Sequence, residues 1–167
     1  KKGFEEAMEV QRERARESWK GSGEEALREV YKSLSALKLK TEFVGYDRLE
    51  AEGKILKIFK GDTEVERGQE GEEVEVITDR TPFYGEAGGQ AGDQGGLSNN
   101  GTRMEISRST KPLPDVIVHH GTIKSGVLRV GDTMTLRVNP ETRGKTALNH
   151  TATHLLHAAL RQVLRDH

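Results

Sequence analysis

The stretch Thr81-Pro82-Phe83-Tyr84-Gly85-Glu86-Ala87-Gly88-Gly89-Gln90-Ala91-Gly92-Asp93-Gln94-Gly95-Gly96 lies in the part of the chain that decides the fold. Sixteen of the nineteen glycines fall between residues 45 and 144, where helical periodicity is absent. Short alternating apolar and polar runs separated by glycine breaks are typical of antiparallel strands. This spacing predicts a small, glycine-rich antiparallel β-barrel or sandwich. The expected strands are 54–59, 73–78, 103–107, 115–119, 121–124 and 133–138.

Helical patterns are found on both sides of this region, so the expected fold class is α+β. Before it, residues 4–20 and a second segment starting at Ser22 form a predicted helical pair. The second segment has an apolar seam that must pack on something. After the barrel, Asn139 is expected to cap a helical turn, with Pro140 at its first position and Gly144 interrupting it. A long terminal helix is then predicted from about 145 to 164. The residues of the seam are Leu27, Val30, Leu34 and Leu37.

Composition excludes several classes of protein and site. The chain has no cysteine, so it has neither disulfides nor thiolate metal sites. It also has no apolar run long enough for a signal peptide or a membrane span, so a cytoplasmic protein is expected. The net charge of −1 divides into +2 for residues 1–40, −6 for 41–136 and +3 for 137–167. An acidic middle disfavours contact with a polyanion there, although local patches matter more than sums.

The glycine-rich stretch does not have the spacing of a nucleotide-binding loop. No two of its glycines lie two positions apart, and no Gly-Lys-Ser/Thr follows, so both common phosphate-binding patterns fail. Two readings remain for this stretch: a barrel corner with bulges, and a place where a bulky ligand approaches the backbone closely. Gln90 is its candidate functional residue, because an amide can both donate and accept a hydrogen bond.

Three histidines near the C-terminus form the second candidate site. His150, His154 and His157 have helical spacings of four and three, so they share one stripe of a helix. Two of them can reach one zinc ion, but two imidazoles are only half of a tetrahedral set. The competing reading is that they border an apolar helix face. Thr151 stands where a metalloprotease needs a glutamate, which argues against that class.

The neighbouring pair His119 and His120 is interpreted as structural. Adjacent residues of a strand point to opposite faces, so the two rings cannot comfortably bind one metal ion.

Taken together, these residues resemble alanyl-tRNA synthetases. The run from Asn149 to Leu160 is similar to the family's editing-domain helix. The stretch from Thr81 through Asp93 is similar to the glycine-rich motif of the adjoining barrel, and Phe4 through Arg16 resembles the end of the preceding helical region. The likeness covers nearly the whole chain. It implies an internal fragment divided into the tail of the tRNA-recognition helices (1–40), a barrel linking domain (41–138) and the truncated start of the editing domain (139–167).

The resemblance also implies roles for individual residues. His150 and His154 match zinc ligands of the editing site, whose other two ligands would follow His167. Gln90 matches a glutamine that approaches the editing pocket and helps select the wrong amino acid. ATP and Mg²⁺ would bind in a catalytic domain upstream of Lys1. Zinc could orient the substrate, or polarise water or a carbonyl, and the sequence leaves this choice open.

The expected activity of the parent is ligation of alanine to its tRNA, with hydrolysis of mischarged Ser- and Gly-tRNA. The fragment alone is expected to be inactive. Its expected partner is tRNA(Ala), with no membrane, and an exposed terminal helix is a possible surface for self-association. Two other hypotheses are a free-standing editing hydrolase and a non-catalytic barrel adaptor. The two helices before Thr41 argue against the former, and an adaptor has no need of His150 and His154.

Overall fold

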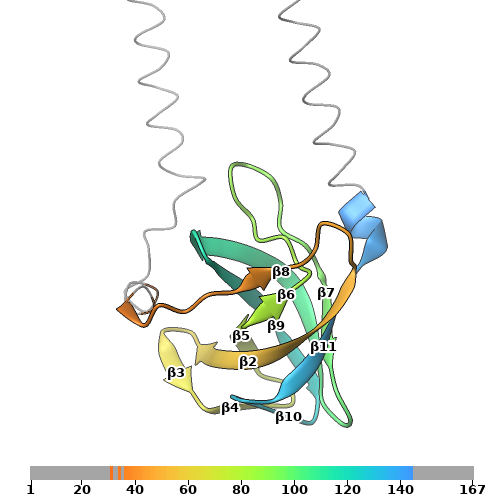
Figure 1. The fold of residues 1–167 in the computed structure, drawn as a ribbon. Coiled ribbons are helices and arrows are strands. Elements are labelled where there is room, and N and C mark those ends of the chain that lie inside the picture. Colours follow the sequence, from red (N-terminus) through yellow and green to blue (C-terminus); the bar gives the residue numbers. More distant parts are fainter. Residues whose placement is uncertain (1–30, 32–33, 35, 145–167) are drawn as a thin grey trace, which may run out of the picture.

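Six antiparallel strands form a closed barrel in the computed structural model, which describes Tyr31, Leu34 and residues 36–144. Around the barrel the strand order is β11-β7-β8-β9-β5-β2, and pairing of β11 with β2 closes the ring (Figure 1). The barrel strands are β2 (Glu50–Lys60), β5 (Glu73–Thr78), β7 (Gly95–Ser98), β8 (Arg103–Leu113), β9 (Val116–Ser125) and β11 (Thr133–Val138). The predicted antiparallel barrel is therefore confirmed.

Apolar side chains from all six strands fill the barrel. Strict alternation along β2 would put Ile55 and Ile58 on opposite faces, yet both are buried in the interior. The register of β2 against β5 shifts between Ile55 and Lys57, so the bulge there inserts the residue that realigns them. The buried interior residues are Ile55, Ile58, Val74, Val76, Phe83, Leu97, Met104, Ile106, Ile123, Leu128, Met134, Leu136 and Val138.

A second, smaller core covers the outer face of β2, β5 and β9. Phe59, Ile77, Val116 and Val118 pack there with Tyr31 and Leu34, which are 3% and 1% exposed. Residues of β5 and β9 in this region are consequently buried on both faces. The helical residues preceding the barrel thus supply a lid for one of its sides.

That second core tests part of the predicted apolar seam. Leu34 packs on the barrel as expected, whereas Leu37 is 56% exposed, so its predicted burial is wrong. Helical backbone ends at Ala36 and the chain reverses at Lys38, whose φ is 52°, so Leu37 lies beyond the packed face. Leu27 and Val30, like most of the predicted helical pair, lie outside the described residues.

Shorter strands complete the described part of the chain. β1 (Glu42–Phe43) runs parallel to β6 (Arg80–Thr81), and β3 (Thr63–Val65) forms a hairpin with β2. β4 (Arg67–Gln69) and β10 (Val127–Arg129) form an antiparallel two-stranded ribbon at one end of the barrel. Strands predicted at 115–119 and 121–124 are in fact one strand, β9, which continues through Gly121.

The predicted C-terminal helix is described only at its beginning. Residues 140–144 are helical, Gly144 included. The predicted break between this turn and a helix from 145 falls at the limit of the described residues and stays a prediction. The rest of the predicted helix lies outside the described residues. No helix in the described part of the chain is both long and apolar enough to cross a membrane.

Candidate functional site

The glycine-rich stretch forms a loop, residues 82–94, that leaves the barrel between β6 and β7 (Figure 1). At its tip the backbone amide of Gln90 donates to the Ala87 carbonyl at 3.1 Å. Gly88 and Gly89, the two residues between them, have φ of 60° and 82°. Two consecutive positive φ values define a tight turn that favours glycine at both positions. Gln90 is therefore presented directly after the turn of a projecting loop, where it is half-buried.

Glycines at the base of this loop have a different purpose. A Cβ on Gly92 would lie 1.8 Å from the Ser109 carbonyl oxygen of β8, and one on Gly85 would lie 2.9 Å from the Thr110 carbonyl oxygen. The Glu86 amide donates to the same Ser109 oxygen at 2.8 Å. The close neighbour of these glycines is strand β8 of the barrel itself. The stretch is a loop laid on β8, and the reading of a close approach by a ligand stays a prediction.

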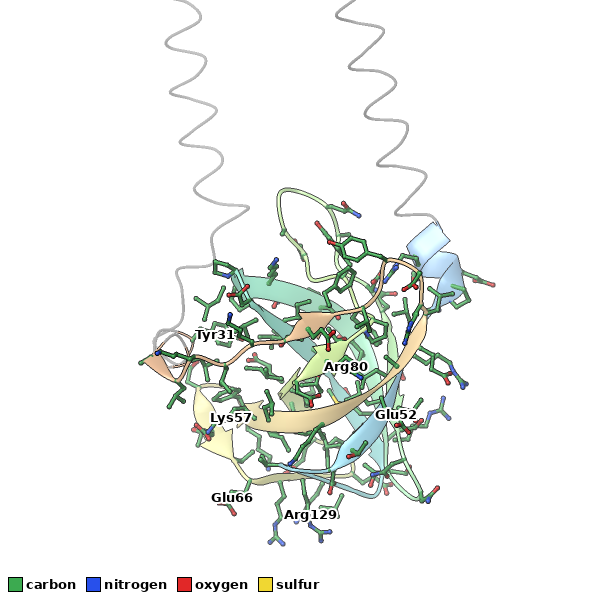
Figure 2. All side chains as sticks on the ribbon, viewed as in Figure 1. Tyr31, Glu52, Lys57, Glu66, Arg80 and Arg129 are labelled. Atoms are coloured by element: carbon green, nitrogen blue, oxygen red, sulfur yellow. The ribbon has the colours of Figure 1, made fainter. Side chains whose placement is uncertain are left out.

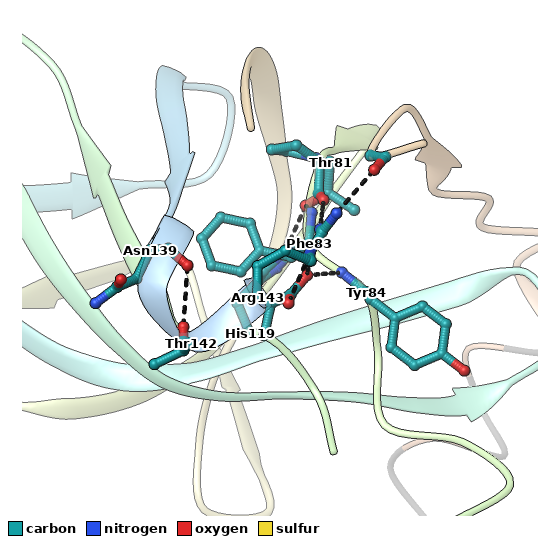
Figure 3. Close-up of polar contacts among 10 residues, drawn as sticks. Thr81, Phe83, Tyr84, His119, Asn139, Thr142 and Arg143 are labelled. Carbon is teal, nitrogen blue, oxygen red and sulfur yellow. Dashed lines mark hydrogen bonds and ion pairs between the residues drawn. The ribbon is translucent and has the colours of Figure 1, made fainter. Parts of the chain in front are cut away.

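Arg143 joins this loop to the start of the C-terminal helix (Figure 3). Its Nε donates to both carboxylate oxygens of Asp93, at 2.9 and 3.0 Å. Its Nη1 and Nη2 donate to the carbonyls of Gly45 and Pro82, at 2.8 and 2.7 Å. The Asp93 side chain is 2% exposed and also accepts from the Tyr84 amide at 2.6 Å. We call Arg143, Asp93 and these backbone partners the Arg143 cluster.

The helix that carries Arg143 begins as the sequence predicts. Asn139 Oδ1 accepts from the Glu141 amide at 2.9 Å, and Pro140 takes the first helical position. The Asn139 amide donates to the Gln94 carbonyl at 2.8 Å. The beginning of this helix is thereby bonded to both Asp93 and Gln94, the last residues of the glycine-rich loop.

Below the loop, His119 is fully buried in the barrel. Its Nδ1 lies 3.0 Å from the Val76 carbonyl oxygen, and its Nε2 lies 2.8 Å from Thr81 Oγ1. A carbonyl only accepts, so Nδ1 carries the proton and Nε2 accepts from the Thr81 hydroxyl. That hydroxyl oxygen also accepts from the Phe83 amide at 3.1 Å. The ring of Phe83 packs edge-on against the imidazole, with 5.2 Å between ring centroids.

The two adjacent histidines are indeed separated. His120 lies on the other face of β9, with Nε2 2.8 Å from Thr110 Oγ1 and Nδ1 3.5 Å from Glu75 Oε1. The interpretation of this pair as structural is confirmed for His119, which holds the beginning of the glycine-rich loop through Thr81.

Burial has a consequence for stability. Desolvation lowers the pKa of His119 from its ordinary value of 6.5 to about 4. The unfolded chain binds this proton more readily than the folded chain. The free energy of unfolding is therefore highest above pH 6.5, where the imidazole is neutral in both states, and it falls as the pH decreases toward 4. We expect the free energy of unfolding to fall by about 2 kcal/mol between pH 7 and pH 5 through this residue. Urea denaturation at each pH measures this decrease. In His119→Gln the free energy of unfolding should depend less steeply on pH. An equal slope in that variant would contradict the assignment.

Sequence reasoning missed the Arg143 cluster. Asp93 was visible as a carboxylate among glycines, but its partner lies 50 residues away, and no local pattern connects them. The other candidate residues, His150, His154 and His157, lie outside the described residues. Within residues 36–144, together with Tyr31 and Leu34, no three His, Asp or Glu side chains are grouped so that they could hold a metal ion.

Comparisons with known proteins agree on one family. Residues 1–142 match the family model of tRNA synthetases class II (A). Proteins named alanine--tRNA ligase are similar over 99% of this chain: 47% identical in Chelativorans sp. (strain BNC1), 45% in Magnetococcus marinus and 47% in Pseudomonas entomophila. The chain spans about a fifth of the length of these relatives, 19%, 19% and 18% respectively. This chain, which folds into a barrel with a glycine-rich loop and matches the family model over residues 1–142, belongs to the family of tRNA synthetases class II (A).

Proposed function

We propose that this chain is the barrel region of an alanine–tRNA ligase that attaches alanine to its tRNA using ATP and hydrolyses tRNA carrying serine or glycine. The similarity to proteins named alanine--tRNA ligase, at 45–47% identity over almost the whole chain, supports the ligase. In this proposal ATP and Mg²⁺ bind in a catalytic domain elsewhere in the longer protein. The role of the barrel is in the hydrolytic correction step.

The Arg143 cluster is the observation that carries this role. The loop that carries Gln90 is attached at its base to the first turn of the helix that begins at Pro140, because Arg143 of this turn bonds to Asp93 and Pro82. The chain continues from that turn toward His150 and His154. A rigid connection between two parts of a site is what a reaction with strict geometric demands requires. The guanidinium group of Arg143 therefore constrains both the base of the loop that carries Gln90 and the helical turn that precedes His150 and His154 in the sequence.

Chemical selectivity explains why a second site is needed. A pocket sized for alanine cannot strongly reject glycine, and it rejects serine only modestly. In the proposed site the side-chain amide of Gln90 binds the serine hydroxyl. Alanine lacks this hydroxyl, so correctly charged tRNA is spared. His150 and His154 supply two neutral imidazoles, which suit zinc but leave half of its ligands to residues beyond this chain. Zinc in such a site supplies a Lewis acid that orients or polarises.

Hydrolysis of Ser-tRNA tests the proposal. The assay compares this chain with the protein extended by roughly a hundred residues, and only the extended protein is expected to be active. In it, Gln90→Ala should lower the rate about tenfold, the value of one hydrogen bond of about 1.4 kcal/mol. Gln94→Ala is the matched control: Gln94 is exposed, and its backbone carbonyl keeps the bond to Asn139. Equal rates in the two variants would refute the role of Gln90.

A further inference from the structure

Two arginines face each other across the ribbon formed by β4 and β10. The register pairs Arg129 directly with Arg67, and Leu128 with Gly68. Leu128 is fully buried and Gly68 is buried too, so the alternating pattern turns both arginines to the outer face. Figure 2 shows Arg129 at this end of the barrel, directed away from it.

The two side chains occupy the closer kind of cross-strand position. The Val130 amide donates to the Glu66 carbonyl at 2.9 Å, so residues 66 and 130 are a hydrogen-bonded pair. In an antiparallel ladder the next pair, 67 and 129, is then a non-hydrogen-bonded pair, with about 4.5 Å between Cα atoms. Like charges directly opposite at such a position destabilise a sheet. The arrangement is therefore unfavourable for the isolated ribbon.

No carboxylate of the described residues neutralises either arginine. Two of the neighbouring acids have other partners: Asp132 Oδ2 accepts from the Arg129 backbone amide at 3.0 Å, and Glu72 pairs with Lys60. The exposed Glu66 and Glu70 form no ion pair with either arginine in the described part of the chain. Hydrogen bonds from Lys60 and the Gln69 backbone amide lower the pKa of Glu72, as expected for a carboxylate that already accepts from other donors. Both guanidinium groups are exposed and retain their donors for a ligand.

The backbone below the pair is firmly held. A Cβ on Gly68 would lie 2.6 Å from Ile123 Cδ1, so β4 lies tightly on the barrel interior. On the other strand, Leu128 inserts into the same core. Because both strands are anchored, the two arginines cannot relieve their repulsion by separation of the strands.

We propose that Arg67 and Arg129 together bind one phosphate group of the tRNA backbone. Two guanidinium forks offer several planar N–H donors, which match the oxygens of a phosphate. A bound phosphate converts the repulsion into two attractive contacts. The net charge of −6 over residues 41–136 restricts the contact to this pair and opposes a broader nucleic-acid surface. The inference rests on the proposed function for the identity of the RNA.

The location separates this contact from the hydrolytic chemistry. The β4–β10 ribbon and the glycine-rich loop lie at opposite ends of the barrel (Figure 1). Loss of the arginines should therefore weaken tRNA binding without altering the selectivity assigned to Gln90.

Fluorescence anisotropy with labelled tRNA(Ala) tests the pair in the 167-residue chain. We expect Arg67→Gln with Arg129→Gln to weaken binding about tenfold and to reduce the slope of log K against log salt by about 1, the value for one phosphate. The two single losses should not add, because both side chains act on the same group. Lys54→Gln, which removes an exposed cation without an ion pair on β2, should change affinity less than twofold.

Denaturation and a lipid control complete the test. The double variant should unfold at a denaturant concentration no lower than the parent, since a like-charge contact has been removed. Unchanged tRNA affinity, absence of tRNA binding by the chain, or a loss equal to that of Lys54→Gln would overturn the proposal. So would arginine-dependent binding to phosphatidylglycerol vesicles in place of tRNA. Failure of the Gln90 experiment alone would remove the editing role and leave this contact intact.

Discussion

Replacing Arg143 with alanine should lower the free energy of unfolding by about 3 kcal/mol. The substitution leaves the Asp93 carboxylate, 2% exposed, without its cation, and leaves the carbonyls of Gly45 and Pro82 without their donors. Removing one partner of a buried ion pair is costly because the remaining charge has lost its hydration. The Tyr84 amide still donates to Asp93, which keeps the expected loss near the lower end of the usual range.

Urea denaturation measures this loss, and Arg137→Ala is its control. Arg137 also pairs with a glutamate, Glu50, but its side chain is 73% exposed. An exposed pair contributes at most about 1 kcal/mol, so the two arginine variants should differ clearly. Amide exchange at Tyr84 and Asp93 should accelerate in Arg143→Ala and not in the control. If both variants lose the same stability, the Arg143 cluster does not anchor the loop.

Gly92→Ala should destabilise the protein by a comparable amount, about 3 kcal/mol. The added methyl group would lie 1.8 Å from the Ser109 carbonyl oxygen and 3.0 Å from the Glu86 amide nitrogen. Backbone atoms cannot rotate away as a flexible side chain does. The loop must therefore lift from β8, which breaks the 2.8 Å hydrogen bond between Glu86 and Ser109. Asp93 is the next residue, so the Arg143 cluster should be disturbed as well.

Gly144→Ala provides the opposite result with the same chemical change. No atom of the described residues lies within 4 Å of a Cβ at position 144, and the residue is helical. Alanine loses less conformational entropy than glycine in a helix, so this variant should gain roughly 0.5–1 kcal/mol. Thermal unfolding of both variants checks the pair. A Gly92→Ala protein as stable as the parent would mean that β8 and the loop do not lie in contact.

Local patterns predicted the barrel but missed its least regular strands. The run 73–78 coincides with β5, and its first four residues alternate polar and apolar. By contrast β7, Gly95–Ser98, has only Leu97 as a buried apolar residue, so it has no periodicity to detect. It is a strand because β8 and β11 pair on its two sides. The break predicted at His120-Gly121 failed because Gly121 is needed inside β9, where a Cβ would lie 1.9 Å from the Glu105 oxygen.

The candidate site divides in the same way. Asn139 and Pro140 form a cap through residues adjacent in sequence, and that prediction is confirmed. The bonds of Arg143 to Asp93, Pro82 and Gly45 connect segments that are distant in sequence, and only the folded barrel brings them together. Gln90 was selected for its chemistry and lies on a projecting loop, but its role stays a prediction.

Closure of the strand ring also determines how copies of this protein can meet. Pairing of β11 with β2 leaves no open backbone edge in the six-stranded ring, so a foreign strand finds no donors or acceptors to extend it. At β3 the outer edge spans only three residues and carries Glu64, a short and charged template that discourages amyloid-like stacking. Association of two copies through the six-stranded ring must consequently use side-chain surfaces, which makes it sensitive to point substitutions.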